Sequence, residues 1–244
     1  KRLLAAAKKH GMTVVPEIDM PGHSEAFERA MGFGMQTEEG KKVLKKVLDE
    51  VCEVFADAPY IHIGGDEVAT TAAYLNEMIA YVESKGKKVI GWDEILEGEV
   101  AENATVMSWR GTAGGLQAAR MGHDVIMTPN TFYYLDYYQS LDKENEPLAI
   151  GGYVPVEKCY SYDPSADGMT AEEQKRILGV QANLWTEYIA SDDHLEYMLL
   201  PRLAALSEVQ WCQAENKSWE RFLDSADDFC AIYDVMDYQY GKHI

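Results

Sequence analysis

The stretch Tyr60-Ile61-His62-Ile63-Gly64-Gly65-Asp66-Glu67 joins a short apolar run to two glycines and two adjacent carboxylates. The apolar run predicts a buried strand, along which neighbouring side chains point to opposite faces. The two acids can therefore share a pocket only if the strand ends at the glycines and the backbone turns there, which glycine permits. The pair then suits acid–base chemistry. The same sequence is also consistent with a structural role, in which the Asp caps the following helix and the Glu is solvated.

The chain on either side of this stretch alternates between segments with helical spacing and apolar runs. Helices are predicted at residues 1–10, 40–56, 71–85, 113–121, 193–210 and 218–235, and strands at residues 13–19, 60–63, 88–94, 105–109, 124–128 and 177–185. Such alternation indicates a parallel sheet in an α/β fold. Six units without a Gly-rich phosphate loop favour a TIM (β/α)8-type barrel, of which about six βα units are present in this chain.

One long segment, residues 129–175, is rich in Tyr, Pro, Asp and Gly. Loops of this length are usually functional or carry extra structure. No internal repeat, low-complexity tract or linker divides the chain. We therefore expect residues 1–244 to form one catalytic β/α barrel domain, incomplete at its N-terminal side.

The composition excludes several classes of partner. The chain has 244 residues, of which 47% are hydrophobic, and a formal net charge of −19. This charge argues against a nucleic-acid or anionic-membrane partner, because binding phosphates needs Lys and Arg. No apolar run approaches the roughly 20 residues that span a bilayer.

The four cysteines, Cys52, Cys159, Cys212 and Cys230, form no C-x-x-C pair. They predict free thiols, mostly buried, and no zinc signature.

The ends of the predicted strands carry acids and aromatic side chains, and in such barrels the active site lies at the carboxyl ends of the strands. The acids and aromatics at these ends are Glu17, Asp19, Asp66, Glu67, Trp92, Asp93, Glu94, Trp109, Tyr134, Asp136, Trp185 and Glu187. Trp stacks on the apolar faces of sugar rings, and acids accept hydrogen bonds from hydroxyls. One such Trp would more simply pack in the core. Three at equivalent positions beside acids favour a carbohydrate site.

Five motifs occur in order between about Gly11 and Trp211. They are Val15-Pro16-Glu17-Ile18-Asp19-Met20-Pro21-Gly22-His23, His62-Ile63-Gly64-Gly65-Asp66-Glu67, Gly91-Trp92-Asp93-Glu94, Tyr134-Leu135-Asp136 and Leu184-Trp185-Thr186-Glu187. Together they resemble glycoside hydrolase family 20, the β-N-acetylhexosaminidases. The second and third motifs are specific, whereas the fourth is weak alone.

The resemblance implies an exo-acting, retaining glycosidase that removes terminal β-linked N-acetylhexosamine, GlcNAc or GalNAc. Its mechanism is substrate-assisted: the 2-acetamido oxygen attacks the anomeric carbon and gives an oxazolinium intermediate, an exception to the two-carboxylate rule. The implied partner is a carbohydrate, with no metal and no other cofactor. The polymeric substrates of such enzymes favour a periplasmic or secreted location.

The resemblance also implies roles for the two acids and one tyrosine. Glu67 matches the general acid, which later acts as base for water, and we expect burial and the Asp66 charge to raise its pKa. Asp66 matches the residue that stays ionised, orients the acetamido group and stabilises its cationic N–H. Tyr134 matches the hydroxyl that bonds the acetamido oxygen, although the Tyr133–Tyr138 cluster could simply pack the long segment.

The remaining site residues are matched to substrate binding. Trp92, Trp109 and Trp185 correspond to the walls of the acetyl pocket, and Asp136 and Glu187 to partners of the outer sugar hydroxyls. His23, with Asp19, either supports the site or closes its own loop with a local hydrogen bond. His62 is either part of the site or a satisfied core histidine. Glu17 and Asp93 are expected to be structural or supporting, and Arg110 has no assigned role.

One departure from the family pattern concerns the first two βα units, which are absent from this sequence. The first strand of the family supplies an Arg that grips sugar hydroxyls, and no residue here matches it. We therefore expect the isolated chain to be inactive or weakly active, with two open sheet edges.

Two other functions remain open from the residues alone. A metal-dependent barrel hydrolase could use Asp19, His23, His62 and Asp66, although the sequence lacks an H-x-H pair or another clear ligand spacing. A non-catalytic sugar-binding barrel is the other alternative, because fold does not determine function. The presence of both Asp66 and Glu67 speaks against it.

Overall fold

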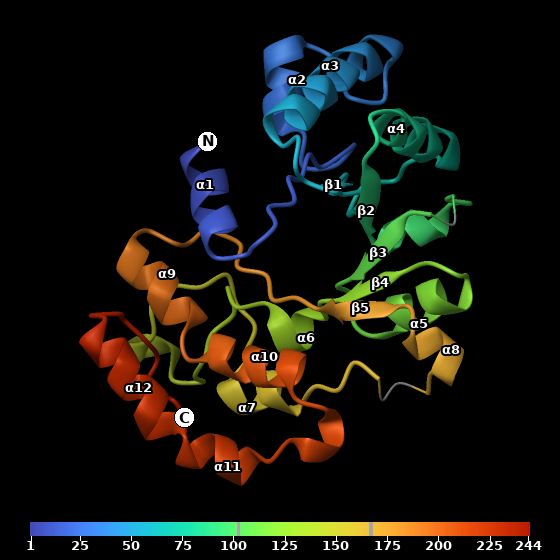
Figure 1. Cartoon of the computed structure of the whole chain (residues 1–244). Helices are drawn as coiled ribbons and strands as arrows, with labels where there is room; N and C mark the ends of the chain where they lie inside the picture. Colours follow the sequence, from blue (N-terminus) through green and yellow to red (C-terminus); the bar gives the residue numbers. More distant parts are fainter. Residues whose placement is uncertain (102, 166–167) are drawn as a thin grey trace. The chain divides into compact units, whose positions relative to one another are not determined.

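The computed structural model describes residues 1–101, 103–165 and 168–244 (Figure 1). In this part of the chain the strands follow one another in chain order, β1-β2-β3-β4-β5, in a five-stranded sheet. They are β1 (Tyr60–His62), β2 (Lys88–Trp92), β3 (Thr105–Ser108), β4 (Val125–Met127) and β5 (Ile177–Val180). β2 pairs in parallel with both β1 and β3. This confirms the predicted α/β class and a parallel sheet that forms part of a barrel.

The chain separates into two compact units, which are described individually. The first unit comprises residues 1–108 and 114–125, and the second comprises residues 109–113 and 126–244.

The helices of the first unit follow the predicted pattern, with two additions. They are α1 (Arg2–Lys9), α2 (Glu25–Met31), α3 (Glu38–Val54), α4 (Ala72–Ser84), the 3-10 helix η1 (Asp93–Glu97) and, apart from its first residue, α5 (Ala113–Arg120). The short α2 and η1 were not predicted, and the strand predicted at 88–94 ends at Trp92, just before η1. Thr37 and Thr71 cap α3 and α4 by accepting hydrogen bonds from the backbone N–H groups of Gly40 (3.0 Å) and Tyr74 (3.2 Å). These caps place both helix starts where the sequence predicts them.

The predicted strand at residues 13–19 is present only as an extended segment, so this expectation is wrong in detail. Glu17 makes an isolated parallel bridge with His62. The His62 N–H donates to the Pro16 carbonyl (2.9 Å), and the Ile18 N–H donates to the His62 carbonyl (3.0 Å). Proline has no N–H to donate, which limits the ladder that the segment can form. The segment nevertheless lies along β1, and the Met20 N–H donates to the Ile63 carbonyl (3.0 Å).

The second unit contains the long segment 129–175 and the closing helices. Its helices are α6 (Asn130–Tyr133), η2 (Lys143–Asn145), α7 (Val156–Ser161), α8 (Ala171–Gln174), α9 (Asp192–Leu199), α10 (Arg202–Trp211), η3 (Ala214–Asn216), α11 (Trp219–Asp224) and α12 (Ala226–Val235). Four of these lie within residues 129–175, so the expectation of extra structure in this segment is confirmed.

Three predicted elements of the second unit are shorter than expected. The single helix expected at 193–210 is split into α9 and α10 around Pro201, because proline disfavours helical geometry in the residue before it. The helix expected at 218–235 is split at Ser225, whose hydroxyl donates to the Arg221 carbonyl (3.1 Å). β5 ends at Val180 rather than residue 185, although Asn183 still forms an isolated parallel bridge with Tyr134.

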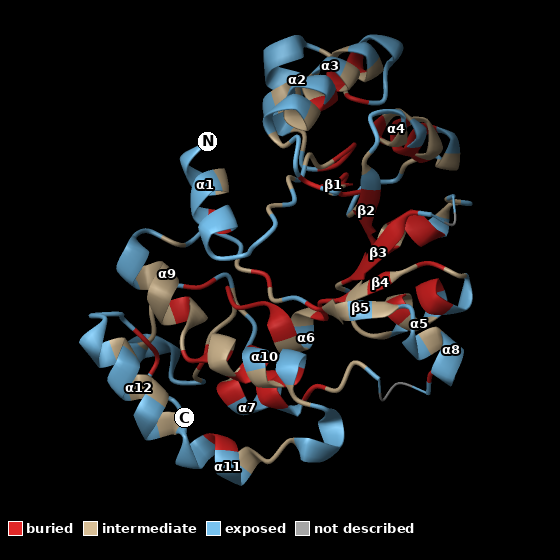
Figure 2. Ribbon diagram, viewed as in Figure 1, coloured by how far each residue is buried: buried red, intermediate tan, exposed pale blue. Residues whose placement is uncertain are grey.

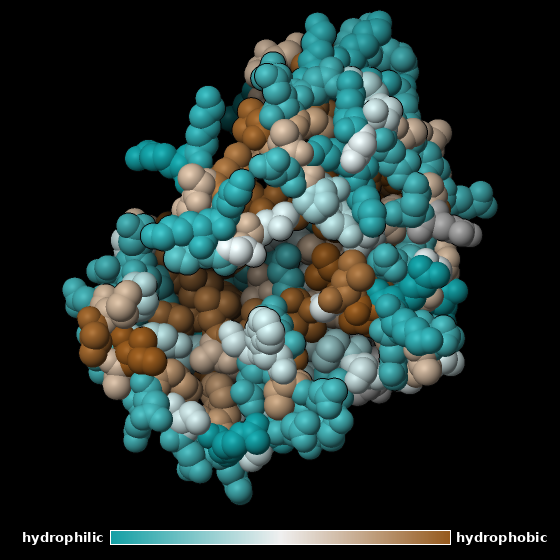
Figure 3. Space-filling model, in the orientation of Figure 1, coloured by the Kyte–Doolittle hydropathy of each residue, from teal (hydrophilic) through white to brown (hydrophobic). Residues whose placement is uncertain are grey.

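The strands β2 and β3 lie in the core, as Figure 2 shows. All four residues of β3 are buried, which is typical of a parallel strand covered on both faces. Hydrophilic side chains cover much of the outer surface seen in Figure 3, in keeping with the acidic composition. None of the described helices has the length and apolar character needed to cross a membrane.

Candidate functional site

The glycine turn after β1 brings the two acids to the same place, as the sequence predicts. The pairing with β2 continues beyond β1, since the Ile63 N–H donates to Ile90 (2.9 Å) and the Trp92 N–H donates to Gly64 (2.8 Å). The chain then turns through positive φ angles of 68° at Gly64 and 98° at Gly65. These angles favour glycine. A side chain on Gly64 would also collide with the Asp19 carboxylate.

Asp19 stabilises this turn and shapes the environment of Asp66. Its Oδ1 accepts a hydrogen bond from the Gly65 N–H (3.1 Å). Burial and then the neighbouring Asp19 carboxylate raise the pKa of Asp66 to about 6. Burial also raises the pKa of Asp19. Two carboxylates this close disfavour simultaneous ionisation. At neutral pH and above Asp66 is mainly ionised, and it takes up a proton as the solution becomes mildly acidic.

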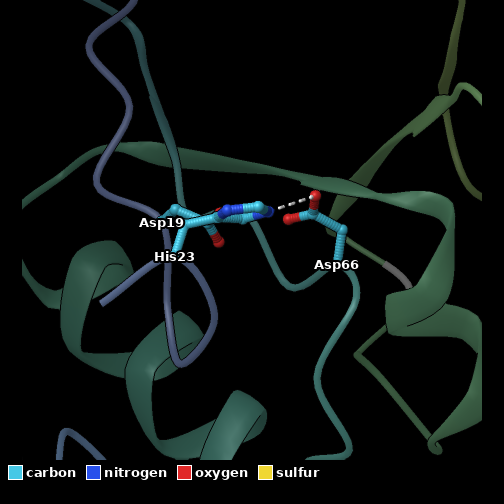
Figure 4. A group of neighbouring side chains, drawn as sticks. All are labelled: Asp19, His23 and Asp66. Atoms are coloured by element: carbon cyan, nitrogen blue, oxygen red, sulfur yellow. Dashed lines mark ion pairs between the residues drawn. The ribbon is translucent and has the colours of Figure 1, made fainter. Parts of the chain in front are cut away.

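His23 lies between the carboxylates of the first unit, and its ring faces Asp66 in Figure 4. Its Nε2 lies 3.4 Å from Asp66 Oδ2 and 3.3 Å from Glu67 Oε2. The distance to Asp19 Oδ2 is 4.0 Å. Burial opposes the change, but the three negative charges raise the pKa of His23 above its ordinary value. His23 thus contacts both acids of the pair, which fits a supporting role better than closure of its own loop.

Glu67 differs from the expectation for a general acid. Its side chain is 56% exposed, whereas that of Asp66 is 14% exposed. The burial that we expected around Glu67 is therefore absent from this structure. Its backbone has φ of 59°, a left-handed value that is uncommon for a residue with a side chain and often marks a functional constraint.

A second network in the first unit links Glu17, His62 and Trp92. The indole Nε1–H of Trp92 donates to Glu17 Oε1 (3.0 Å), and the Nδ1 of His62 lies 3.3 Å from the same oxygen. His62 Nδ1 also accepts from the Gly64 N–H (3.0 Å), and its ring packs on Trp92 with centroids 4.7 Å apart. Trp92 is only 3% exposed. Glu17 and His62 therefore orient Trp92 and the start of the glycine turn.

Three of the four residues considered for a metal site lie together. One ligand atom each from Asp19, His23 and Asp66 lies within 4.8 Å of the others. Ion pairs between the histidine and the acids explain this proximity without a metal ion.

The cysteines are free thiols: Cys159 is buried, but the other three are partly exposed, so the expectation of mostly buried thiols is wrong for them.

The second unit holds an aromatic cluster centred on Tyr134. Trp109 stacks on Tyr134 with centroids 5.9 Å apart and planes 14° apart. Trp185 and Tyr137 contact the tyrosine edge-on, at 6.3 Å and 5.6 Å. Burial raises the pKa of Tyr134 above its ordinary value, so the phenol keeps its proton and can donate it in a hydrogen bond. The neighbouring Tyr133 packs against Phe132 and Tyr162 instead, so only part of the tyrosine cluster is core packing.

Backbone hydrogen bonds set the relative positions of Tyr134 and Trp185. The Asn183 N–H donates to the Tyr133 carbonyl (2.8 Å), and the Leu135 N–H donates to the Asn183 carbonyl (2.7 Å). This short parallel pairing holds the segment before Trp185 against the segment that carries Tyr134. Two stretches about 50 residues apart in sequence thus meet through the main chain.

Asp136 and Glu187 also lie in the second unit, in different environments. Asp136 is 5% exposed, whereas Glu187 is exposed. Burial raises the pKa of Asp136 to about 6, the Glu187 charge adds to this rise, and the Arg202 charge opposes it. Its Oδ1 is buried and has no hydrogen-bond partner among the described residues. A buried acceptor of this kind suits a ligand hydroxyl.

Two features of these clusters were missed by the sequence reasoning. One is the contact of Glu17 with Trp92, which the strand ends alone do not specify. The other is Arg202, which is fully buried in α10. The signal for it was present, because Arg202 falls on the same helical stripe as the buried residues Ala205, Leu206 and Val209.

The sequence matches one family description, glycosyl hydrolase family 20, catalytic domain, over residues 1–73 and 69–214. A β-hexosaminidase of Porphyromonas gingivalis is 36% identical over 94% of this chain and 35% of that protein. A β-N-acetylhexosaminidase of Cellulomonas fimi is 30% identical over 98% of this chain and 53% of that protein. The chain therefore spans between about a third and a half of the length of these relatives.

Solved structures that resemble this chain belong to the same family. An exo-β-N-acetylglucosaminidase of Vibrio harveyi in complex with N-acetylglucosamine has a TM-score of 0.88 at 27% identity, covering 99% of this chain and 45% of that one. A β-N-acetylhexosaminidase of Streptomyces coelicolor has a TM-score of 0.89 at 28% identity, covering 99% of this chain and 55% of that one. Both of these proteins are described as members of family GH20.

Proposed function

Because the chain belongs to the catalytic domains of glycosyl hydrolase family 20, we propose that the protein containing it removes terminal β-linked N-acetylhexosamine from carbohydrates. The reaction proceeds with retention of anomeric configuration, through an intermediate formed by the acetamido group of the substrate. The known relatives that carry the names β-hexosaminidase and β-N-acetylhexosaminidase support this activity.

The observation that supports the proposal best is the glycine turn with its two acids. It places Asp66 and Glu67 against one imidazole while giving them different exposure, 14% and 56% for the side chains. One acid is thus held within the protein and the other reaches solvent. Adjacent carboxylates in different environments can divide the work between stabilising charge and transferring a proton, although here burial raises the pKa of Asp66, the charge-stabilising group, and not that of the proton donor.

The proposed reaction begins with Glu67, which donates a proton to the glycosidic oxygen as the bond to the anomeric carbon breaks. The acetamido oxygen forms a bond to that carbon, and positive charge develops on the acetamido nitrogen. The Asp66 carboxylate accepts the N–H hydrogen bond and stabilises this charge. Water then attacks the anomeric carbon as the bond between that carbon and the acetamido oxygen breaks, which restores the acetamido group, and Glu67 accepts a proton from the water. Two displacements on opposite faces leave the configuration unchanged.

The second unit contributes the groups that hold the sugar. The Tyr134 hydroxyl donates to the acetamido oxygen and directs it towards the anomeric carbon, which its retained proton permits. Trp109 and Trp185 both pack against Tyr134 and present apolar surface to the acetyl methyl group. Trp92 of the first unit has the same proposed role. Asp136 and Glu187 accept hydrogen bonds from the outer hydroxyls. Holding these hydroxyls excludes further sugar residues and makes cleavage exo-type.

The full protein tests this proposal when it is given two aryl glycosides that differ only at carbon 2. The 2-acetamido glucoside is expected to be hydrolysed, and proton NMR should show the β-anomer of the sugar as the first product. The plain glucoside should be hydrolysed at least about 1,000-fold more slowly, because it lacks the intramolecular nucleophile. Equal rates on the two glycosides, or the α-anomer as first product, would contradict the mechanism.

A metal-dependent hydrolase is the second candidate, and the proximity of Asp19, His23 and Asp66 is the observation that favours it. Prolonged dialysis of the full protein against a chelator distinguishes the two. Substrate-assisted hydrolysis should be unaffected, whereas a metal enzyme should lose activity and recover it with zinc. Tight N-acetylglucosamine binding without any turnover would instead indicate a sugar-binding barrel.

A further inference from the structure

Arg202 is the first residue of α10, and its side chain is fully buried within the second unit. Burying a guanidinium group costs free energy unless its donors and its charge are compensated. Its pKa is lowered by burial to about 10, so it remains charged at neutral pH. The proposed reaction assigns no role to this charge.

The guanidinium satisfies all five of its N–H groups with main-chain carbonyls. Nη1 donates to Tyr137 (2.9 Å) and Val154 (3.0 Å), and Nε donates to Met198 (3.1 Å). Nη2 donates to Leu135 and again to Met198. A guanidinium has five donors in one plane, and no other side chain can reproduce this set.

Two of these carbonyls belong to the residues on either side of Asp136. Arg202 therefore holds the main chain immediately before and immediately after this carboxylate. Leu135 also follows Tyr134 directly, and its N–H is bonded to Asn183 (2.7 Å). The segment 134–137 is thus held on one side by the Asn183 pairing and on the other by the Arg202 side chain.

We propose that Arg202 is a positioning residue that fixes Asp136, and with it Tyr134, in the orientation needed to bind the terminal sugar. The inference rests on the proposed function, because it assumes that these two residues contact the substrate. Arg202 does not touch the sugar itself. It acts through the Leu135 and Tyr137 carbonyls, and a rigid support of this kind is what keeps a binding group within reach of its ligand.

The charge of Arg202 has a second effect at the same place. Burial raises the pKa of Asp136, and the positive charge of Arg202 opposes that rise. A neutral side chain at position 202 would let the pKa of Asp136 rise further. Ionised Asp136 would then be present only at higher pH. A lysine would keep the charge but offers one nitrogen in place of three.

The test compares Arg202→Lys and Arg202→Met with Asp136→Asn in the full protein. Arg202→Lys should lower kcat/KM by about 10- to 100-fold, as expected for a displaced binding group, with little change in the acid limb of its pH profile. Arg202→Met should lower kcat/KM similarly and move that limb to higher pH. In an Asp136→Asn background, Arg202→Lys should change kcat/KM by less than about twofold, because the group that it positions is already disabled.

Leu206→Ala serves as the matched control, since Leu206 is buried in the same helix and its side chain has no group that can donate a hydrogen bond to these carbonyls. It should lower the melting temperature and leave kcat/KM unchanged below that temperature. Normal kcat/KM for both Arg202 variants, with Asp136→Asn impaired, would overturn the inference alone. Normal kinetics for Asp136→Asn would overturn both the inference and the proposed role of Asp136. If neither Arg202 variant folds while Leu206→Ala does, Arg202 serves folding only and the inference fails.

Discussion

The two units of the molecule each contain an aspartate whose pKa burial helps to raise to about 6, but they balance its charge differently. Asp66 lies beside His23, whose side chain is 56% exposed and can gain or lose its proton. Asp136 lies near Arg202, which is fully buried and permanently charged at neutral pH. The charge beside Asp66 can therefore change with pH and with bound substrate, whereas the charge near Asp136 stays constant at neutral pH.

This difference matches the work that we propose for each unit. The first unit moves protons and stabilises a charge that appears only during the reaction, so an adjustable environment is suitable. The second unit recognises groups that the substrate always carries, so a rigid environment built from stacked rings and main-chain bonds is suitable. Substitutions in the first unit should therefore lower the rate of the chemical steps, whereas substitutions in the second unit should impair recognition of the sugar.

The largest effect is expected for Glu67→Gln, which removes the proton donor of the first unit. General acid–base catalysis contributes typically 100- to 10,000-fold, so kcat on an unactivated N-acetylglucosaminide should fall about 1,000-fold with little change in KM. The same variant should lose less on an aryl glycoside with a good leaving group, which needs less protonation. Near-normal kcat on the unactivated substrate would remove Glu67 from its proposed role.

Asp66→Asn should lower kcat by about 100- to 1,000-fold, because the amide cannot supply the negative charge that stabilises the acetamido cation. The wild-type protein should lose kcat as the pH falls through about 6, where Asp66 takes up a proton. That loss should disappear from the kcat profile of the variant. A variant that keeps the wild-type acid limb would show that another group controls it.

Tyr134→Phe tests the second unit with the smallest possible change, the loss of one hydroxyl. The hydroxyl directs the acetamido oxygen towards the anomeric carbon, and a misplaced nucleophile should cost about 100-fold in kcat. The effect should be confined to substrates that carry the acetamido group. The matched control is Tyr133→Phe, in the core beside Phe132 and Tyr162, which should leave kcat unchanged. Equal effects of the two substitutions would argue for packing rather than catalysis.

The smallest effect concerns stability rather than activity. Between about pH 4 and 6 the folded protein binds protons at Asp66 and Asp136 more tightly than the unfolded chain, so each aspartate lowers stability as the pH rises through this range. Asn at either position avoids that cost and should add about 2 kcal/mol to the free energy of unfolding at pH 7, and much less at pH 4. Urea titrations at both pH values measure the difference. If the increase in the free energy of unfolding were the same at both pH values, ionisation of the aspartate would not be its cause.

The sequence predicted the α/β class, the parallel order and most helices, because apolar periodicity and caps such as Thr37 and Thr71 are local signals. It also predicted the turn at Gly64 and Gly65. It did not predict that proline would reduce residues 13–19 to an extended segment, or that Pro201 would divide a helix. Both changes depend on how one residue limits hydrogen bonding along an otherwise favourable pattern.

Strand ends and family motifs predict Asp66, Glu67 and Tyr134 as site residues, but they do not predict the electrostatics around these residues. The exposure of Glu67 depends on how the chain leaves the glycine turn. The raised pKa of Asp66 depends first on burial and then on Asp19, more than 40 residues away. The helical spacing places Arg202 on the buried stripe of α10, but its partners are main-chain carbonyl groups, which the amino-acid sequence does not identify.

The crowding around Gly64 limits how this site can diversify. Any side chain at that position would meet the Asp19 carboxylate, so substitutions within the turn are closed to gradual improvement. The pKa of Asp66 can instead be altered through neighbours such as His23, whose charge acts on the carboxylate without occupying the turn. Packing thus constrains the backbone of the turn, whereas the charges around it can change.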